Sequence, residues 1–309
     1  MGVAVVGSLG LDTIQTPTGR VVDVLGGSAA YFALAARHFT NVHLVAVVGE
    51  DFPDSARAAL RHPELDLSGL ETRPGRTFRW EGVYSDDLNT RRTIRTELNV
   101  FESFRPDLPA SVRAARDVFL ANIDPVLQRE VLGQLQSPRL VLADTMNYWI
   151  ENKREELLRT LRDVQILLIN EEEARELTGE PLTHRAARAI LELGPQTVVV
   201  KMGEHGAFLR NGEDVFACPA VPLETVVDPT GAGDTFAGGF MGALSRMGRV
   251  TEGNLRRAVV YGCVLASFAV EEFGVGALLR MERDEALRRA EAVTAMTRVS
   301  LDNTARVFR

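Results

Sequence analysis

Cysteine is scarce in this sequence, and no long apolar run is present. Cys218 and Cys263 lie far apart and neither belongs to a C-x-x-C pair, so neither a disulfide framework nor a cysteine zinc site is predicted. No segment approaches the 18 or so uninterrupted apolar residues of a membrane span, and the start MGVAVVG lacks the basic region of a signal peptide. We therefore expect a cytoplasmic protein with no membrane partner.

Positive charge is also in short supply. The chain of 309 residues has 35 Lys and Arg against 42 Asp and Glu, a formal charge of −7, which argues against nucleic acid as a partner. A small anionic ligand needs only local positive potential. The one notable basic cluster, Arg91, Arg92 and Arg95, fits a solvated strand face as well as a place near substrate.

Short apolar runs rich in β-branched residues recur along the chain and predict buried parallel strands. They lie at 3–7, 43–48, 118–121, 140–143, 166–169 and 197–200. Helical periodicity appears at 27–38, 125–136, 151–162, 183–193, 233–247, 253–270 and 283–297. Strands that alternate with helices predict an α/β fold with a central, mostly parallel sheet, and no linker divides the chain, so we expect one domain over 1–309.

The segment from Glu71 to Leu98 breaks this rhythm. Aromatic residues and glycine recur at every second position from Phe78 to Tyr84, and DDLN at 86–89 predicts a hairpin turn. With VVDVL at 21–25, this hairpin would form a small sheet able to cover a site, built from about 13–25 and 71–98. Periodicity alone fits equally well an antiparallel extension of the main sheet.

The segment DPTGAGDTF at 228–236 carries the clearest chemistry. Gly231 and Gly233 flank Ala232 directly before an apolar helical run, so backbone N–H groups at a helix start can approach an anion. Asp234 stands beside them, where a carboxylate can accept the proton of an attacking hydroxyl. The alternative is purely conformational, because aspartate is also a common helix N-cap and Gly-rich turns often precede helices.

The longer string DPTGAGDTFAGGF resembles the C-terminal signature of the PfkB, or ribokinase-like, carbohydrate kinases. The resemblance implies a three-layer α/β/α domain with a small β-sheet lid, ATP as phosphoryl donor, Mg²⁺, Asp234 as general base, and residues 231–233 as an anion hole. It implies an ATP-dependent kinase that phosphorylates a hydroxyl of a small sugar-containing molecule.

Other segments match this family in the expected order. GSLGLD at 7–12 and LGGSAAYF at 25–32 place Asp12, Gly26 and Gly27 where the family binds substrate, although the two glycines also suit a helix-entry turn.

Two further matches concern the nucleotide and the metal. INEEEARELTG at 169–179 puts Asn170 near the phosphates and Glu173 near Mg²⁺, which it would contact directly or through water; a solvated acidic first helical turn is the alternative. In KMGEHGAF at 201–208, the resemblance assigns Lys201, Gly203 and Gly206 to the nucleotide side, whereas read alone the glycines indicate an ordinary turn.

The match is loose at Tyr31 and Asp124, whereas Asp228 and Thr230 fit it. Tyr31 stands where ribokinases usually carry Asn, and it fits either helix core or a contact with an apolar part of a larger substrate. Asp124 aligns loosely with an acidic substrate-binding position. Asp228 and Thr230 match positions that help bind a monovalent cation such as K⁺, while a turn aspartate commonly accepts backbone hydrogen bonds instead.

The acceptor and the competing functions stay open at this point. A free sugar and a ribonucleoside present a hydroxyl to the same base, and an edge of the small sheet offers a surface for a homodimer. A non-catalytic sugar- or nucleotide-binding protein is one rival. The other is a dinucleotide-dependent oxidoreductase, suggested by GSLG at 7–10 after a strand, although that segment lacks the full G-x-G-x-x-G fingerprint.

Overall fold

The centre of the molecule is a nine-stranded sheet, described here from a computed structural model of residues 2–88 and 90–298. The strands follow the order β13 (Asp214–Cys218), β12 (Ala207–Asn211), β11 (Thr197–Lys201), β10 (Ile166–Asn170), β9 (Leu140–Asp144), β8 (Asp117–Leu120), β1 (Gly2–Val6), β4 (Asn41–Gly49) and β5 (Leu65–Arg73). All neighbours from β11 to β5 pair in parallel, and β12 and β13 pair antiparallel at one edge. The predicted parallel strands are confirmed.

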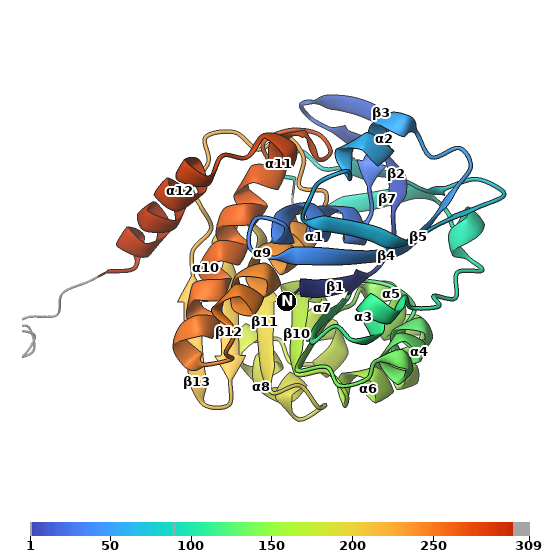
Figure 1. Cartoon of the computed structure of the whole chain (residues 1–309). Coiled ribbons are helices and arrows are strands. Elements are labelled where there is room, and N and C mark those ends of the chain that lie inside the picture. Colours follow the sequence, from blue (N-terminus) through green and yellow to red (C-terminus); the bar gives the residue numbers. More distant parts are fainter. Residues whose placement is uncertain (1, 89, 299–309) are drawn as a thin grey trace, which may run out of the picture.

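Helices cover both faces of this sheet and make three layers (Figure 1). The first face carries α1 (Ser28–Ala36), α9 (Ala232–Met247) and α10 (Glu252–Ala269), with α11 (Gly276–Arg280) and α12 (Arg283–Met296) beside α10. The other face carries α3 (Ala110–Arg113), α4 (Pro125–Gln134), α5 (Asn147–Asn152), α6 (Arg154–Leu161), α7 (Glu171–Thr178) and α8 (Thr183–Leu191). Short elements are α2 (Asp54–Ala59), η1 (Asn99–Phe101) and η2 (Gly203–His205).

The inner strands of the sheet are apolar over most of their length because each face of the sheet packs against helices. In β1, Val5 belongs to the core on the α9 side and Val6 to the core on the α4 side, and neither is exposed to solvent. Side chains of a strand alternate between faces, so a sheet covered on both faces needs apolar residues at every position. The predicted α/β/α architecture is confirmed.

A second, four-stranded sheet stands apart from the central one, and we call it the lid sheet. Its order is β3 (Gly19–Gly26), β2 (Gly10–Thr16), β6 (Phe78–Tyr84) and β7 (Arg91–Glu97), in which β2 and β6 pair in parallel. The hairpin is therefore no extension of the central sheet. Its strands begin earlier than the expected residue 13, residues 71–73 lie in β5, and position 89 of the predicted turn lies outside the described residues.

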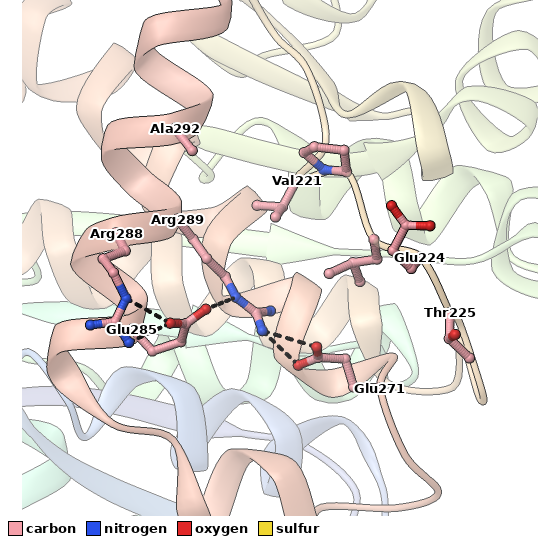
Figure 2. A pocket seen from close by; sticks show the side chains of 10 residues that line it. Val221, Glu224, Thr225, Glu271, Glu285, Arg288, Arg289 and Ala292 are labelled. Carbon is pink, nitrogen blue, oxygen red and sulfur yellow. Dashed lines mark hydrogen bonds and ion pairs between the residues drawn. The ribbon is translucent and has the colours of Figure 1, made fainter.

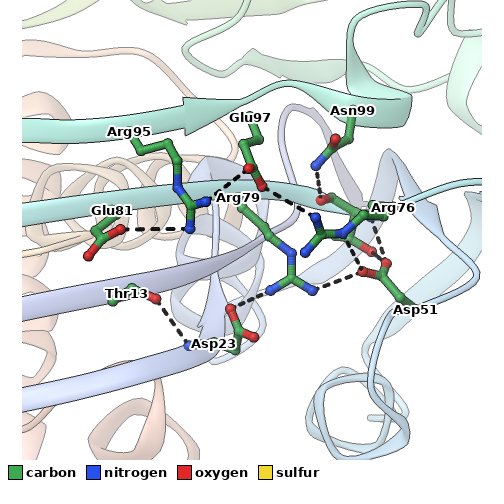
Figure 3. A network of polar contacts seen from close by, with 10 residues as sticks. Thr13, Asp23, Asp51, Arg76, Arg79, Glu81, Arg95, Glu97 and Asn99 are labelled. Atoms are coloured by element: carbon green, nitrogen blue, oxygen red, sulfur yellow. Dashed lines mark hydrogen bonds and ion pairs between the residues drawn. The ribbon is translucent and has the colours of Figure 1, made fainter.

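A network of polar contacts ties the lid sheet to the central domain (Figure 3). Asp51, which follows β4, accepts hydrogen bonds from the backbone N–H and the hydroxyl of Thr77, at 2.6 and 2.7 Å. The guanidinium of Arg79 bridges Asp51 at 2.9 Å and Asp23 of β3. The base of the hairpin is thereby fixed to the end of a core strand.

The helix expected at 151–162 is the one clear misjudgement of helix bounds. The structure divides this region into α5 and α6 at Lys153, which has φ −137° and ψ 37° and lies outside the helical region.

Both cysteines are buried free thiols. No helix within residues 2–88 and 90–298 is long and apolar enough to cross a membrane.

Candidate active site

The carboxyl ends of three neighbouring parallel strands supply one side of the site. β9 ends at Asp144, β10 at Asn170 and β11 at Lys201, and their register places these ends at the same edge of the sheet. Open α/β sheets bind ligands at this edge. Lys201 Nζ lies 2.8 Å from Asp144 Oδ2, and although burial opposes the charge of Lys201, Asp144 and Glu173 outweigh it and raise the pKa of the ammonium.

Asn170 and Glu173 form a capping box at the start of α7. Asn170 Oδ1 accepts a hydrogen bond from the Glu173 N–H at 2.8 Å, and Glu173 Oε2 accepts one from the Asn170 N–H at 3.0 Å. Glu173 is buried rather than solvated, so the alternative of an exposed acidic turn fails for this residue. Burial raises the pKa of Glu173 to about 7, and the charge of Lys201 opposes that rise.

The loop before α9 has the form expected of an anion-binding turn. Gly231 is the N-cap of α9 with φ +75°, and a Cβ there would lie 2.4 Å from the ring of Tyr31, so both the conformation and the contact require glycine. The Ala232 N–H donates to the Pro229 carbonyl, and within residues 2–88 and 90–298 the N–H groups of Gly233 and Asp234 donate no hydrogen bond. Two free donors therefore remain at this helix end.

Asp234 is not a helix cap. It is the third residue of α9, and its carboxylate makes no hydrogen bond or ion pair within the described part of the chain. Burial raises its pKa to about 7, the nearby Asp144 adds to the rise, and Lys201 and Arg91 oppose it. A Cβ at the adjacent Gly233 would lie 3.2 Å from Lys201 Nζ, so the ammonium lies close beneath the loop.

Asp12 faces the same space from the lid sheet. It is buried in β2, and a Cβ at Gly26 would lie 1.9 Å from its Oδ2, so only glycine lets the two strands approach there. Burial raises the pKa of Asp12 to about 7, with Asp228 and Asp234 adding to the rise. Gly27, with φ +96°, is also the N-cap of α1, so the helix-entry reading of this glycine is confirmed.

Tyr31 belongs both to the core and to the site. Its side chain is fully buried in α1, its ring packs against Gly231, and its hydroxyl has no hydrogen-bond partner within the described residues. Burial raises the pKa of the phenol far above its usual value, and the charges of Asp12 and Asp228 add to the rise. An unpaired buried hydroxyl is costly, so this group is available to a ligand.

Asp228 and Thr230 form a turn that touches the lid sheet. Asp228 Oδ1 accepts a hydrogen bond from the Thr230 N–H at 2.8 Å, as expected of a turn aspartate, while its buried Oδ2 has no partner within the described residues. The Thr230 hydroxyl donates to the Tyr84 hydroxyl of β6 at 3.0 Å. A lid strand therefore contacts the anion-binding loop directly.

Asp124, Gly203 and Gly206, which were predicted as site residues, each have a structural role in a helix cap or a turn. Asp124 is the N-cap of α4, where Oδ1 accepts from the Val126 N–H and Oδ2 pairs with Lys153. Gly203 and Gly206 have φ +55° and +88° in the turn after β11, and a Cβ at Gly206 would clash with a backbone carbonyl. Among the described residues, no hydrogen bond or ion pair joins Asp124 to Asp12, Asp144 or Asp234.

Sequence reasoning missed Asp144 and Tyr84 as site residues, and it left Arg91 undecided between a solvated strand face and a place near substrate. Asp144 directly follows the parallel strand predicted at 140–143, and that position was the available signal. Tyr84 and Arg91 flank the predicted hairpin turn and lie opposite each other in β6 and β7. Nothing in the local sequence says that this end of the hairpin reaches residues 228–234.

A surface hollow lies between residues 221–225 and α12 (Figure 2). Its charges are largely paired, since Arg289 bonds Glu271 and Glu285 and Arg288 bonds Glu285. The hollow contains none of the carboxylates described above. Its lining therefore offers no equivalent of the Asp234 site.

The start of the chain excludes the dinucleotide reading. After β1, the segment GSLG at 7–10 leads into β2 of the lid sheet, and the first helix begins only at Ser28. A dinucleotide fingerprint needs its glycines to open a helix directly after the strand. The oxidoreductase alternative is therefore wrong.

Comparisons with known proteins agree with this geometry. The chain is 34% identical over 252 residues to a cytidine kinase of Thermococcus kodakarensis, which covers 80% of this chain and 89% of that protein. Its fold is similar to Arabidopsis thaliana ribokinase complexed with ribose and ATP, with a TM-score of 0.74, 24% identity and coverage of 94% and 98%. A putative ribokinase II from E. coli in complex with ATP and Mg²⁺ gives a TM-score of 0.75, 19% identity and coverage of 95% and 99%.

A family model also matches almost the whole chain. Residues 3–281 fit the model described as pfkB family carbohydrate kinase, and this range holds every residue of the site. The chain belongs to the pfkB family of carbohydrate kinases.

Proposed function

We propose that this kinase transfers the γ-phosphoryl group of ATP to a hydroxyl of a ribonucleoside, with Asp234 as the general base. One observation carries the proposal: the carboxylate of Asp234 is unengaged within the described residues and lies beside two free N–H donors at the start of α9. A pKa near 7 suits a group that must accept a proton at neutral pH.

The chemistry follows from the position of each group. Asp234 takes the proton of the acceptor hydroxyl as its oxygen attacks the γ-phosphorus, and the bond from that phosphorus to the β–γ bridging oxygen breaks. The loop 231–233 stabilises the charge on the phosphoryl group, with the N–H groups of Gly233 and Asp234 as donors and Lys201 beneath them. Asp12, Gly26, Gly27 and Tyr31 hold the acceptor in line.

The residues present suit a nucleotide and its cations. Bound ATP supplies the phosphoryl group, and Mg²⁺ neutralises its phosphates. Asn170, Lys201, Gly203 and Gly206 would line the nucleotide side, and Glu173 would hold Mg²⁺ through water, since no cluster of three or more metal ligands occurs within residues 2–88 and 90–298.

A monovalent cation such as K⁺ also has a plausible place. Asp228 has a buried Oδ2 without a partner in the described residues, and Thr230 follows in the same turn. A buried carboxylate oxygen left unpaired is compensated by a bound cation. We propose these two residues as part of a K⁺ site.

Similarity to a cytidine kinase and the aromatic ring of Tyr31 both favour a ribonucleoside as the acceptor. The cytidine kinase is 34% identical over most of both chains, which favours a ribonucleoside such as cytidine. An aromatic ring in place of a polar Asn suits a substrate with an apolar part better than a free sugar. A reaction between ATP and a nucleoside suits a cytoplasmic enzyme.

A panel of acceptors tests this proposal. Cytidine, uridine, adenosine, guanosine, inosine, ribose and fructose are offered with ATP and Mg²⁺, and ADP formation is measured. Turnover is expected with a ribonucleoside and is expected to vanish in Asp234→Asn. Asp284→Asn is the matched control, because Asp284 lies in the first turn of α12 and is exposed. Full turnover by Asp234→Asn would exclude its role as the base.

A further inference from the structure

The lid sheet lies against the catalytic loop in this structure. Thr230 of the loop donates its hydroxyl to Tyr84 at the end of β6, and the phenol of Tyr84 is partly buried. Burial raises the pKa of Tyr84, while Thr230 and the charge of Arg91 oppose the rise. The turn end of the hairpin, which carries Tyr84 and Arg91, is therefore the part of the lid nearest to residues 228–234.

Arg91 is held in place there without an acidic partner. It lies opposite Tyr84 in the β6–β7 ladder, and its guanidinium lies 5.4 Å from the centre of the Trp80 ring. It makes no ion pair with a carboxylate in residues 2–88 and 90–298, whereas Arg79 pairs with Asp23 and Asp51, and Arg95 with Glu81 and Glu97. An aromatic face orients a guanidinium without neutralising it.

Arg91 is exposed on β7, but its charge reaches the site. It opposes, as one of the smaller causes, the rise in pKa that burial produces at Asp12, Glu173 and Asp234, three carboxyl groups that come from three different elements. Lys201, the other cation of the site, is already paired with Asp144. Asp12, Glu173 and Asp234 form no ion pair with a described residue, and the phosphates of a nucleotide would add negative charge beside them. An unpaired arginine is the group that such a site needs.

We propose that Arg91 donates hydrogen bonds from its guanidinium to the phosphoryl group during transfer, and that Trp80 and Tyr84 position it. This inference rests on the proposed kinase reaction. The bond from the acceptor oxygen to phosphorus forms, the bond to the bridging oxygen breaks, and the proton goes to Asp234. Arg91 stays charged throughout and stabilises the negative charge on the three peripheral oxygens.

Two substitutions at position 91 and one matched control test this role in turnover. Arg91→Ala is expected to lower kcat about 100-fold, as the loss of one preorganised donor typically does, with a smaller change in the KM of the acceptor. Arg91→Lys keeps the charge but loses the planar guanidinium, and its kcat is expected to lie between those of the wild type and Arg91→Ala. Arg92→Ala is the control, because Arg92 is next along β7, points to the opposite face, and makes no ion pair with a described residue.

A binding measurement separates this inference from the proposed function. Affinity for MgADP alone and for MgADP with aluminium fluoride, which imitates the transferring phosphoryl group, is measured by calorimetry for the wild type and both alanine variants. Arg91→Ala is expected to weaken the aluminium fluoride complex at least tenfold more than MgADP, and Arg92→Ala to weaken neither. Equal effects on both ligands, or no effect, would overturn the role of Arg91. This readout needs no acceptor, so a wild type that phosphorylates nothing in the panel overturns the proposed function alone.

Discussion

Three carboxyl groups of the site, those of Asp12, Glu173 and Asp234, have a pKa well above that of an ordinary carboxyl group. Burial is the largest cause in each case and raises the pKa to about 7. The charge of Asp234 adds to the rise at Asp12, and the charge of Asp144 adds to the rise at Asp234. Because a general base must be ionised, the protonation of these groups sets the working pH of the enzyme.

This protonation predicts the pH dependence of catalysis. We expect kcat/KM to be low at pH 5.5, to rise through about pH 7 as Asp234 loses its proton, and to level off near pH 8.5. The rise is expected to exceed tenfold per pH unit where Asp12 must also be ionised. Initial rates at limiting acceptor over this range measure it, and a flat profile between pH 5.5 and 8.5 would contradict the assignment.

The same carboxyl group has a consequence for stability. The pKa of Asp234 is about 7 in the folded protein against 3.8 for an ordinary aspartate, so the folded state binds the proton more tightly. Its favourable contribution is full below pH 3.8 and is lost as the pH rises through 7. The neutral amide of Asp234→Asn avoids that loss, so the variant should gain on the order of 1–3 kcal/mol over the wild type at pH 8.5.

Urea denaturation at pH 5.5 and 8.5 measures this gain. The advantage of Asp234→Asn is expected to shrink at pH 5.5, where the wild-type carboxyl group is mostly protonated. Asp284→Asn, at an exposed position, is the control and should gain no stability at pH 8.5. A variant less stable than the wild type at pH 8.5 would mean that the carboxylate is better paired than its contacts indicate.

At the scale of single residues, the sequence predicted the site residues that lie within a recognisable motif. It did not predict those that reach the site from the hairpin of β6 and β7. Asp234, Gly231 and Asp12 lie in short strings whose spacing carries their chemistry. Tyr84 and Arg91 join the site through a contact between β6 and the 228–230 turn, 146 positions apart in the sequence. Such a contact depends on tertiary packing and cannot be predicted from local sequence periodicity.

At the scale of elements, Asp51 is the anchor of the lid hairpin. It accepts two hydrogen bonds from Thr77, which is fully buried, and pairs with Arg79. Replacing Asp51 with Ala leaves the Thr77 N–H without its acceptor and Arg79 with a single partner, a change expected to cost about 1–3 kcal/mol locally. We expect amide hydrogens of β6 and β7 to exchange at least tenfold faster in Asp51→Ala.

Hydrogen exchange followed by mass spectrometry tests this anchor. Asp54→Ala is the matched control, because Asp54 is an exposed aspartate three residues further along, in the first turn of α2. The central strands β1 and β8 should keep their protection in both variants. Unchanged exchange of β6 in Asp51→Ala would show that the hairpin is held by packing alone.

Elements with uniform burial were predicted well, and elements with mixed burial were not. The strands β1, β4, β8, β9, β10 and β11 are almost wholly buried and therefore apolar apart from residues near their ends. β5 has the sequence LDLSGLETR and pairs only with β4 at the sheet edge. Its polar side chains interrupt the apolar pattern, so this strand was not predicted. The break between α5 and α6 falls within a helical apolar pattern that continues across Lys153.

At the scale of the whole molecule, the outer side of each edge strand of the lid sheet pairs with no strand within residues 2–88 and 90–298. β3 and β7 are these edges, and each exposes an apolar side chain, Val22 with 58% and Ile94 with 45% of its surface accessible. Unpaired edges favour pairing with another chain. β7 carries Arg91, Arg92 and Arg95, and two copies would bring like charges together, so β3 is the better edge for a homodimer.

A homodimer through β3 is the resulting prediction. Two copies related by a twofold axis would pair β3 antiparallel and bring their Val22 side chains together. Size-exclusion chromatography with light scattering should therefore give about twice the 33.9 kDa of one chain. Val22→Lys places charge against charge and should yield the monomer, whereas Val215→Lys, at the exposed β13 edge of the central sheet, should leave the dimer intact. A wild-type mass of one chain, or a dimer that survives Val22→Lys, would rule out this interface, because only pairing through β3 makes the assembly depend on that side chain.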